Sequence, residues 1–275
     1  MIKEKIARTI GKYRLLNKND KIAVAVSGGK DSTTILYILK QLGYNVEALH
    51  IDVGIRNFSR KNLDNVKHFC AENKIKLHVF SYKNEYSYSL PEIQQILVRK
   101  NIKLKNCSVC GVLRRNLLNK KARTLGFDKL VTGHNLDDAA QEFLMNLFTA
   151  RLSLSARLGP KTGLIDSKGF VPRVKPMYFI REKEIERFSK KQGFNVNYCA
   201  CPLRALAYRN MIRIALDNYE KENKNVKENI TGYFLKIMPW LEKRYENNKE
   251  INKCRSCGES CKDEICMKCV ILGNL

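Results

Sequence analysis

The sequence lacks any apolar run that approaches the roughly 18 residues a membrane-spanning helix needs. Internal repeats are absent, and acidic residues are few: 27 Asp and Glu stand against 51 Lys and Arg, for a net charge of +24. Residues 1–16 are basic and helix-patterned, without the continuous apolar stretch of a secretory signal. These absences predict a soluble, cytoplasmic protein with no membrane span. The excess of positive charge favours a polyanionic partner, either nucleic acid or an anionic membrane surface.

Ten cysteines occur without a secretory signal, so we expect metal, cluster or redox chemistry in a reducing compartment rather than a disulfide scaffold. Two closely spaced CxxC pairs end the chain, a spacing typical of a closed zinc ribbon; they comprise Cys254, Cys257, Cys266 and Cys269. A module this small needs its metal to fold, so we predict a structural Zn²⁺ there. Such a ribbon positions RNA or docks on the body of the protein. Cys261 is left over within it, and Cys70 is expected in the core.

The apolar pattern alternates between short strand-like runs and longer helical ones, which predicts an α/β fold with a parallel sheet wrapped by helices. We expect strands at 21–26, 46–52, 77–82 and 129–132, helices at about 32–42, 61–73 and 136–148, and a long loop over 151–176. Helices are expected over most of 181–245. The predicted parts are an N-terminal helix (1–20), an α/β domain (21–180), a helical extension (181–250) and the ribbon (251–275). The first helix should pack on the domain through Ile2, Ile6, Ile10 and Leu15.

A glycine-rich turn follows the first predicted strand and opens a helix; it reads Ser27-Gly28-Gly29-Lys30-Asp31-Ser32. Paired glycines let the backbone turn tightly, and free N–H groups then point at the helix N-terminus. Together with the helix dipole they form an anion site, which Lys30 and the serine hydroxyls extend. The Walker pattern is absent. The turn therefore predicts a phosphate site of another kind.

The hexapeptide SGGKDS resembles the PP-loop ATPases, also called N-type ATP pyrophosphatases, which split ATP between its α and β phosphates and adenylate a substrate oxygen. Further segments are similar to the tRNA 2-thiolation branch (TtcA/TtuA/Ncs6), namely 49–55, 107–111, 133–138, 144–147 and 201–202. The similarity runs in order through residues 1–245. It implies a PP-loop fold and an ATP-dependent tRNA sulfurtransferase. Such an enzyme adenylates the C2 oxygen of a pyrimidine, here expected to be uridine, and replaces it with sulfur.

In an open parallel sheet, the loops at the carboxyl ends of the strands gather at one crevice. The turns after the predicted strands 21–26, 46–52 and 129–132 should therefore converge. With the resemblance, this implies an ATP site made by Ser27, Gly28, Gly29, Lys30, Asp31, Ser32, His50, Asp52, Gly54, Ile55, Gly133, His134 and Asn135.

Two acidic residues, Asp137 and Asp138, fall in the first turn of the predicted helix 136–148, which Asn135 can cap. Helix capping and the helix dipole alone can account for acids at this position. Their place beside the expected ATP site favours a catalytic role instead, either holding Mg²⁺ on the phosphates or steering the reacting base. Arg114 is a further candidate for contact with ATP or the activated base.

The pair Cys107 and Cys110 cannot complete a tetrahedral zinc site without two more ligands. The resemblance implies a [4Fe–4S] cluster on Cys107, Cys110 and Cys201, whose open iron carries the sulfur. Cys199 is a second candidate for the third ligand, but the family's third cysteine precedes a proline, as Cys201 does. The alternative is a persulfide on a thiolate of lowered pKa, with no cluster. His68 and His78 are expected to be surface or core residues.

Nine basic residues and no acidic one lie between Arg99 and Phe127, and Arg204, Arg209 and Arg213 follow the third cysteine. Since this run brackets the expected sulfur site, we expect the tRNA backbone to lie there. The sulfur donor would be a ubiquitin-like thiocarboxylate carrier, a cysteine desulfurase or free sulfide, and the family suggests a homodimer. Two other readings are a PP-loop ligase that adenylates RNA for another nucleophile and a non-catalytic zinc-ribbon RNA-binding protein.

Overall fold

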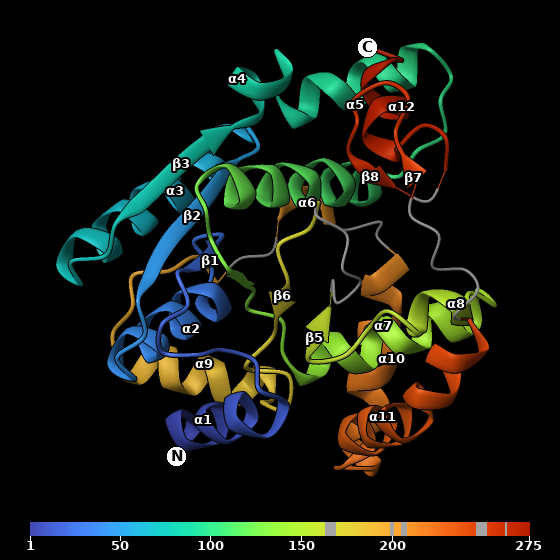
Figure 1. The fold of residues 1–275 in the computed structure, drawn as a ribbon. Coiled ribbons are helices and arrows are strands. Elements are labelled where there is room, and N and C mark those ends of the chain that lie inside the picture. Colours follow the sequence, from blue (N-terminus) through green and yellow to red (C-terminus); the bar gives the residue numbers. More distant parts are fainter. Residues whose placement is uncertain (163–168, 199–200, 205–207, 246–251, 262) are drawn as a thin grey trace.

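The computed structural model describes residues 1–162, 169–198, 201–204, 208–245, 252–261 and 263–275 (Figure 1). Its first half contains α1 (Ile2–Tyr13), β1 (Ile22–Val26), α2 (Lys30–Gln41), β2 (Val46–Asp52), α3 (Arg56–Glu72), β3 (Leu77–Ser81), α4 (Tyr82–Tyr86), α5 (Leu90–Arg99), α6 (Asn106–Thr124) and β4 (Lys129–Val131). The second half contains α7 (Leu136–Phe148), α8 (Leu152–Ser155), β5 (Lys161–Thr162), β6 (Arg173–Val174), α9 (Glu182–Lys191), the 3₁₀ turn η1 (Pro202–Arg204), α10 (Tyr208–Glu222), α11 (Val226–Arg244), β7 (Asn252–Lys253), β8 (Ser260–Cys261) and α12 (Met267–Leu272).

A six-stranded sheet organises the chain, in the order β3-β2-β1-β4-β6-β5. All neighbouring strands are parallel except β5, which runs antiparallel to β6 at the edge. The predicted α/β fold with a mostly parallel sheet is therefore confirmed. The long loop expected over 151–176 is wrong in part, because α8, β5 and β6 form within it. Strands of two residues are too short to show an apolar period.

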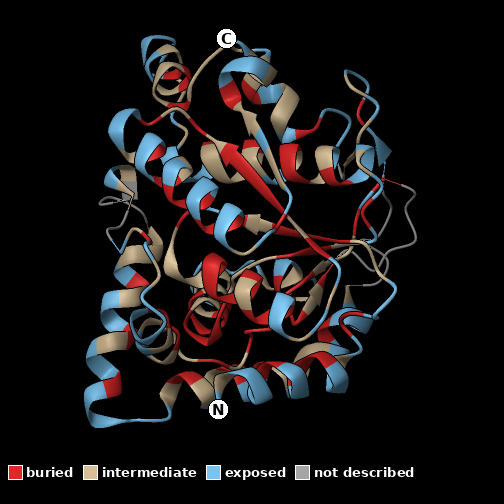
Figure 2. Cartoon of the chain, turned by 90° about the vertical axis from the view of Figure 1, so that its left-hand side faces the viewer, coloured by how far each residue is buried: buried red, intermediate tan, exposed pale blue. Residues whose placement is uncertain are grey.

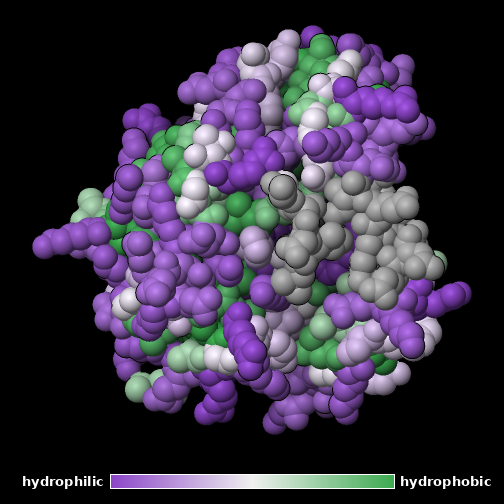
Figure 3. Space-filling model, in the orientation of Figure 1, coloured by the Kyte–Doolittle hydropathy of each residue, from purple (hydrophilic) through white to green (hydrophobic). Residues whose placement is uncertain are grey.

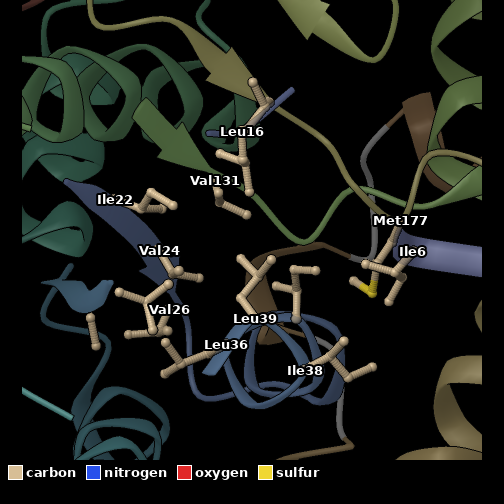
Figure 4. Close-up of a cluster of buried hydrophobic side chains, with 14 of the residues drawn as sticks. Ile6, Leu16, Ile22, Val24, Val26, Leu36, Ile38, Leu39, Val131 and Met177 are labelled. Atoms are coloured by element: carbon tan, nitrogen blue, oxygen red, sulfur yellow. The ribbon is translucent and has the colours of Figure 1, made fainter. Parts of the chain in front are cut away.

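Successive residues of β1 face opposite sides of the sheet, as the two-residue period of a strand requires. Ile22, Val24 and Val26 pack into a core with α1, α2, α3 and α9, part of which Figure 4 shows. Ala23 faces the other side, into a core that includes residues of α5, α6 and α12. Helices thus cover both faces, and their buried sides turn toward the sheet (Figure 2).

The N-terminal helix packs as expected: Ile6, Ile10 and Leu15 are buried, and Ile2 is partly buried against them. On the right of Figure 1, α10 and α11 pack on α7. Hydrophilic side chains cover most of the face seen in Figure 3. Within the described part of the chain, no helix combines the length and the apolar character that a membrane crossing demands.

The C-terminal segment forms a small unit in which β7 pairs with β8 and α12 follows. It docks on the body: α12 packs on α6, and Ile271 is 1% exposed in the core beneath α6. The Arg123 guanidinium of α6 also pairs with the Glu259 carboxylate at 2.5 Å. Docking on the body, one of the two roles expected for this module, is what the structure shows.

Candidate active site

Hydrogen bonds of the Ser32 side chain fix the shape of the turn between β1 and α2. The Ser27 N–H donates to the Ser32 hydroxyl oxygen at 3.1 Å, and that hydroxyl donates to the Gly29 carbonyl at 3.2 Å. Gly28 has φ +82°, and a Cβ atom there would lie 2.7 Å from the Asn62 carbonyl oxygen. A side chain at position 28 would therefore be strained in backbone angle and in space. The structure thus forms the tight glycine turn expected from the sequence, and anion binding by it stays a prediction.

The loop after β4 lies directly against this turn. A Cβ atom on Gly133 would lie 2.9 Å from the Ser32 backbone nitrogen, so only glycine allows the approach. Asn135 caps α7 by accepting from the Asp138 N–H at 3.1 Å, and its side-chain amide donates to the Asp31 carboxylate at 3.2 Å. Two of the three turns expected to converge are thus in contact.

Asp31, in the first turn of α2, has an unusual electrostatic setting. Burial raises the pKa of its carboxyl group to about 6; Lys30 opposes this rise, and the nearby Asp138 and Glu182 add to it. When several carboxylates lie close together, a bound cation stabilises their ionised forms. This arrangement suits a divalent ion on bound phosphates.

The Lys30 ammonium is held by two carboxylates. It donates to Glu182 at 2.6 Å and to Asp31 at 3.2 Å, and its side chain is 13% exposed. Burial by itself lowers the lysine pKa, but the two acids outweigh burial and raise it. Sequence reasoning missed Glu182, because 152 residues separate it from Lys30 and only the packing of α9 on α2 brings the two together.

The two adjacent acids of α7 have different surroundings. One oxygen of Asp137 accepts from Lys227 at 2.6 Å and the other from the Glu182 N–H at 2.7 Å, and the residue is 7% exposed. Asp138 instead pairs with Arg209 of α10 at 3.2 Å and lies near Asp31. Both oxygens of Asp137 are therefore engaged within the fold. Those of Asp138 also have partners, Arg209 and the Asn135 N–H at 3.3 Å, but Asp138 is the acid of the two that lies near Asp31.

Lys227 of α11 is 1% exposed and contacts three carboxylates, those of Asp137, Asp217 and Glu220. No sequence pattern distinguishes it from the many other lysines. A fully buried lysine needs such partners, since an unpaired buried charge is very costly. It ties the helical extension to the start of α7.

The carboxyl end of β2 carries further candidate residues. His50 donates through Nδ1 to the Val26 carbonyl at 2.9 Å, and burial lowers its pKa. Asp52 accepts from the Gly54 N–H at 2.8 Å and shapes the turn in which Gly54 has φ +75°. Nε2 of His50 and Nε of Arg114 are both buried without a hydrogen-bond partner among the described residues. Orphaned polar atoms of this kind are expected where a ligand supplies the missing partner.

Sequence reasoning also missed two charged residues close to His134, namely Lys175 and Glu142. Lys175 is 8% exposed, and its ammonium lies 3.7 Å from the Glu142 carboxylate. Burial lowers the pKa of Lys175, and burial also lowers that of His134 to about 4. His134 is therefore neutral near pH 7, and its Nδ1 lies 2.8 Å from the Thr132 hydroxyl.

Cys107 and Cys110 occupy the first turns of α6. Since α6 leads directly into β4, its N-terminus lies at the carboxyl edge of the sheet, where the turn 27–32 also lies. The Tyr82 hydroxyl, just after β3, donates to the Cys110 carbonyl at 3.0 Å. This contact fixes the start of α6 against the strand ends.

Cys201 reaches the same region from far along the chain. The turn η1 that follows it packs on α6, and the Cys107 Sγ lies 3.8 Å from the Leu203 carbonyl oxygen. Cys110, Cys201 and Leu203 also border the same apolar core. Cys199 lies outside the described residues.

Among the described residues, the only group of three or more potential metal ligands whose ligand atoms all lie within 4.8 Å of one another consists of Cys254, Cys257, Cys266 and Cys269. The Cys266 N–H also donates to the Cys254 sulfur at 3.2 Å, a contact that stabilises a thiolate. The four thiols thus form a preassembled four-ligand site, as the CxxC spacing predicts.

The basic run of 99–127 divides into two parts. Lys120 and Lys121 share the carboxylate of Glu85, and Arg123 pairs with Glu259, so these three charges are partly compensated within the protein. The cations just before the cysteines are exposed; they are Arg99, Lys100, Lys103 and Lys105. The surface beside Cys107 therefore presents positive charge to solvent, as does Arg115 further along α6.

A glycine-rich turn at the carboxyl edge of a mostly parallel sheet, with an acidic helix start against it, is typical of the PP-loop class of proteins. The sequence profile of the PP-loop domain matches residues 2–219, most of the chain. The chain belongs to the PP-loop domain family.

Relatives within this family point to one activity. The chain is 34% identical over 270 residues to the tRNA-5-methyluridine(54) 2-sulfurtransferase of Pyrococcus horikoshii, covering 98% of this chain and 84% of that protein. It is 33% identical over 281 residues to the cytoplasmic tRNA 2-thiolation protein 1 of Drosophila mojavensis, covering 98% and 78%.

A solved structure agrees with these relatives. The U34-tRNA thiolase NcsA of Methanococcus maripaludis, determined with its [4Fe-4S] cluster, superposes with a TM-score of 0.82 at 28% identity, covering 100% of this chain and 87% of that one. The predicted resemblance to PP-loop tRNA 2-thiolation enzymes is confirmed.

Proposed function

We propose that this protein is an ATP-dependent sulfurtransferase that replaces the C2 oxygen of a tRNA uridine with sulfur. One observation carries the proposal: the phosphate cradle and the start of α6, with Cys107 and Cys110, lie on the same edge of the sheet, and Cys201 leads into the turn that packs on α6. Relatives that share nearly the whole chain are named as tRNA 2-thiolation enzymes.

ATP is bound between the converging turns. Residues 27–32 hold its pyrophosphate, and the turns at Gly54-Ile55 and 133–135 enclose the nucleoside. Asp31 and Asp138 hold Mg²⁺ on the phosphates, which relieves the crowding of their carboxylates. His50 and Arg114 face the adenosine or the activated base; Nε2 of the first and Nε of the second are buried and have no hydrogen-bond partner among the described residues.

The first chemical step is adenylation. The C2 oxygen of the target base attacks the α-phosphorus, the bond to the β-phosphate oxygen breaks, and pyrophosphate leaves. A sulfur nucleophile then attacks C2, and the C2–O bond breaks as AMP departs with that oxygen. Adenylation thus converts a poor leaving group into a good one. The base reaches this pocket unpaired or flipped from its stack.

Cys107, Cys110 and Cys201 are the proposed ligands of a [4Fe–4S] cluster, the group that the NcsA structure contains. The ligand atoms of a single metal ion surround one centre, whereas each cysteine of a [4Fe–4S] cluster binds a different iron atom. Cys110 and Cys201 border the same apolar core, and Cys107 contacts the turn that follows Cys201, so the three proposed ligands lie in one region of the fold. When bound, such a cluster leaves one iron without a protein ligand, where exogenous sulfide can be held.

The four C-terminal cysteines are proposed to bind Zn²⁺ in a closed, structural site. The exposed cations of 99–105 are proposed to contact the tRNA backbone next to Cys107. The sulfur donor is proposed to be one of the three predicted sources, namely a thiocarboxylate carrier, a desulfurase or sulfide. A homodimer and a cytoplasmic location complete the proposal.

The test is tRNA thiolation by protein purified and assayed without oxygen, in wild type and in the variants Cys107→Ala and Cys201→Ala. We expect both variants to lose cluster iron, labile sulfide and thiolation while they still bind ATP. Cys261→Ser serves as the matched control, since Cys261 is outside both ligand sets, and it should behave as wild type. Mass spectrometry of tRNA nucleosides gives the product and its position.

Three results would separate the alternatives. Thiolation by an iron-free protein would replace the cluster with a persulfide mechanism. ATP-to-AMP turnover without sulfur incorporation would indicate a PP-loop RNA ligase. Absence of ATP turnover in the presence of tRNA would contradict an enzymatic role.

A further inference from the structure

The lysine of the phosphate cradle already has an anionic partner from another part of the chain. Glu182 opens α9, and its carboxylate lies 2.6 Å from the Lys30 ammonium, closer than the neighbouring Asp31 at 3.2 Å. The Lys30 side chain is 13% exposed and that of Glu182 is 37% exposed, so solvent screens this pair only in part.

Glu182 is held in place at its backbone. The Glu182 N–H donates to the Asp137 carboxylate at 2.7 Å. Asp137 in turn accepts from the ammonium of Lys227 at 2.6 Å, and Lys227 is almost fully buried. Beyond the far end of α9, the Asn197 N–H donates to the Gly28 carbonyl at 3.1 Å. The α9 segment therefore contacts the phosphate cradle on both sides, and Glu182 cannot move away with its backbone.

A bound phosphate needs the same ammonium. A lysine offers three donors, and two of the Lys30 donors point to carboxylates. A phosphate oxygen that approaches Lys30 meets the negative charge of Glu182 at close range, and like charges this near repel each other. The carboxylate and the phosphate therefore compete for one cation.

We propose that the Glu182 carboxylate competes with bound phosphate for the Lys30 ammonium. The phosphates of ATP displace Glu182 from Lys30, and Glu182 pairs with Lys30 again as pyrophosphate leaves. Glu182 acts through Lys30 and is thus a positioning residue. It weakens nucleotide binding and speeds the release of pyrophosphate. This inference rests on the proposed function, because it takes ATP as substrate and pyrophosphate as product.

The test compares Glu182→Gln with Glu184→Gln in the full chain. Glutamine keeps the size and the hydrogen-bonding oxygen of glutamate but removes its charge. Glu184 is the matched control: it lies on the same helix turn and pairs with Lys5 at 2.6 Å, on the surface and outside the site. Equilibrium binding of inorganic pyrophosphate and of Mg·ATP is measured for each protein by titration calorimetry.

We expect Glu182→Gln to bind pyrophosphate and ATP about three- to fivefold more tightly than wild type, the range that a partly exposed ion pair supplies. The gain should shrink at high salt, because salt screens the competing charge. In steady-state thiolation, KM for ATP and kcat should both fall, the latter because pyrophosphate leaves more slowly. A purely structural role predicts no gain of affinity.

Equal or weaker binding by Glu182→Gln, in a protein that melts at the wild-type temperature, would overturn the proposal and make Glu182 a support for Lys30 instead. If wild type binds neither ATP nor pyrophosphate, the proposed function itself fails and the inference fails with it. Glu184→Gln should match wild type in every measurement; a tightening equal to that of Glu182→Gln would also overturn the proposal, since the effect would then be general to α9.

Discussion

Replacing Asp31 with asparagine should stabilise the protein against unfolding near neutral pH, although Asp31 belongs to the nucleotide site. Burial, together with the neighbouring Asp138 and Glu182, raises the pKa of this carboxyl group from 3.8 to about 6 against the pull of Lys30. A shift of about two units corresponds to about 3 kcal/mol, since each unit is worth 1.36 kcal/mol. The side chain is 29% exposed, so screening reduces this to about 1–2 kcal/mol.

The sign follows from proton linkage. Because the folded protein holds this proton more tightly than the unfolded chain, wild type loses stability as the pH rises from about 4 through about 6. Asparagine does not ionise, so the Asp31→Asn variant does not lose stability in this way. The gain of Asp31→Asn over wild type should therefore be absent below pH 4, grow between pH 4 and 6, and stay constant above.

Urea unfolding of the two proteins at several pH values between 4 and 8 measures this difference. All other titrating groups are common to both proteins, so the difference reports the charge of Asp31 and its interactions with Lys30, Asp138 and Glu182. The control is Asp64→Asn on the exposed side of α3, which should show no pH-dependent gain. A gain that does not vary with pH, or a loss of stability at pH 7.5, would refute the electrostatic reasoning.

Three further changes have defined outcomes. Lys227→Met leaves the buried Asp137 without its cation and should lower the free energy of unfolding by about 3–5 kcal/mol in urea titrations; a loss below 1 kcal/mol would mean that the pair contributes little. Gly133→Ala places a Cβ atom 2.9 Å from the Ser32 nitrogen, so ATP should bind about tenfold more weakly in calorimetry; unchanged affinity would show that the two loops separate easily. A chelator should release one zinc per chain from wild type and none from Cys254→Ser, as metal analysis would record; equal zinc in both would move the metal elsewhere.

The central strands could be predicted from the sequence because their apolar runs are short, buried and bounded by turns. The expected strand 46–52 has the bounds of β2, and the expected helix 136–148 has those of α7. The helix expected at 61–73 begins earlier, at Arg56, because its first turns are polar and give no apolar period. Local apolar patterns in the sequence are thus sufficient to predict the central strands and the main helices.

The charged contacts around the site could not be predicted in this way. Lys30 meets Glu182 across 152 residues, and Lys227 meets Asp137 across 90. Such pairs depend on how α9 and α11 pack against the sheet and α7, which no local spacing encodes. The glycines and cysteines were visible because their chemistry is local, whereas their electrostatic surroundings are assembled by the fold.

The helix α6 is a single rod of 19 residues, about 28 Å long, with Cys107 in its first turn and the Arg123 contact to the ribbon in its last. A straight helix transmits tilt from one end to the other with little bending. The two cysteine sites are thus mechanically joined although they share no ligand. If the four ribbon cysteines hold the proposed zinc, its removal is expected to change the orientation of α6 and with it the position of Cys107 at the opposite end of the helix.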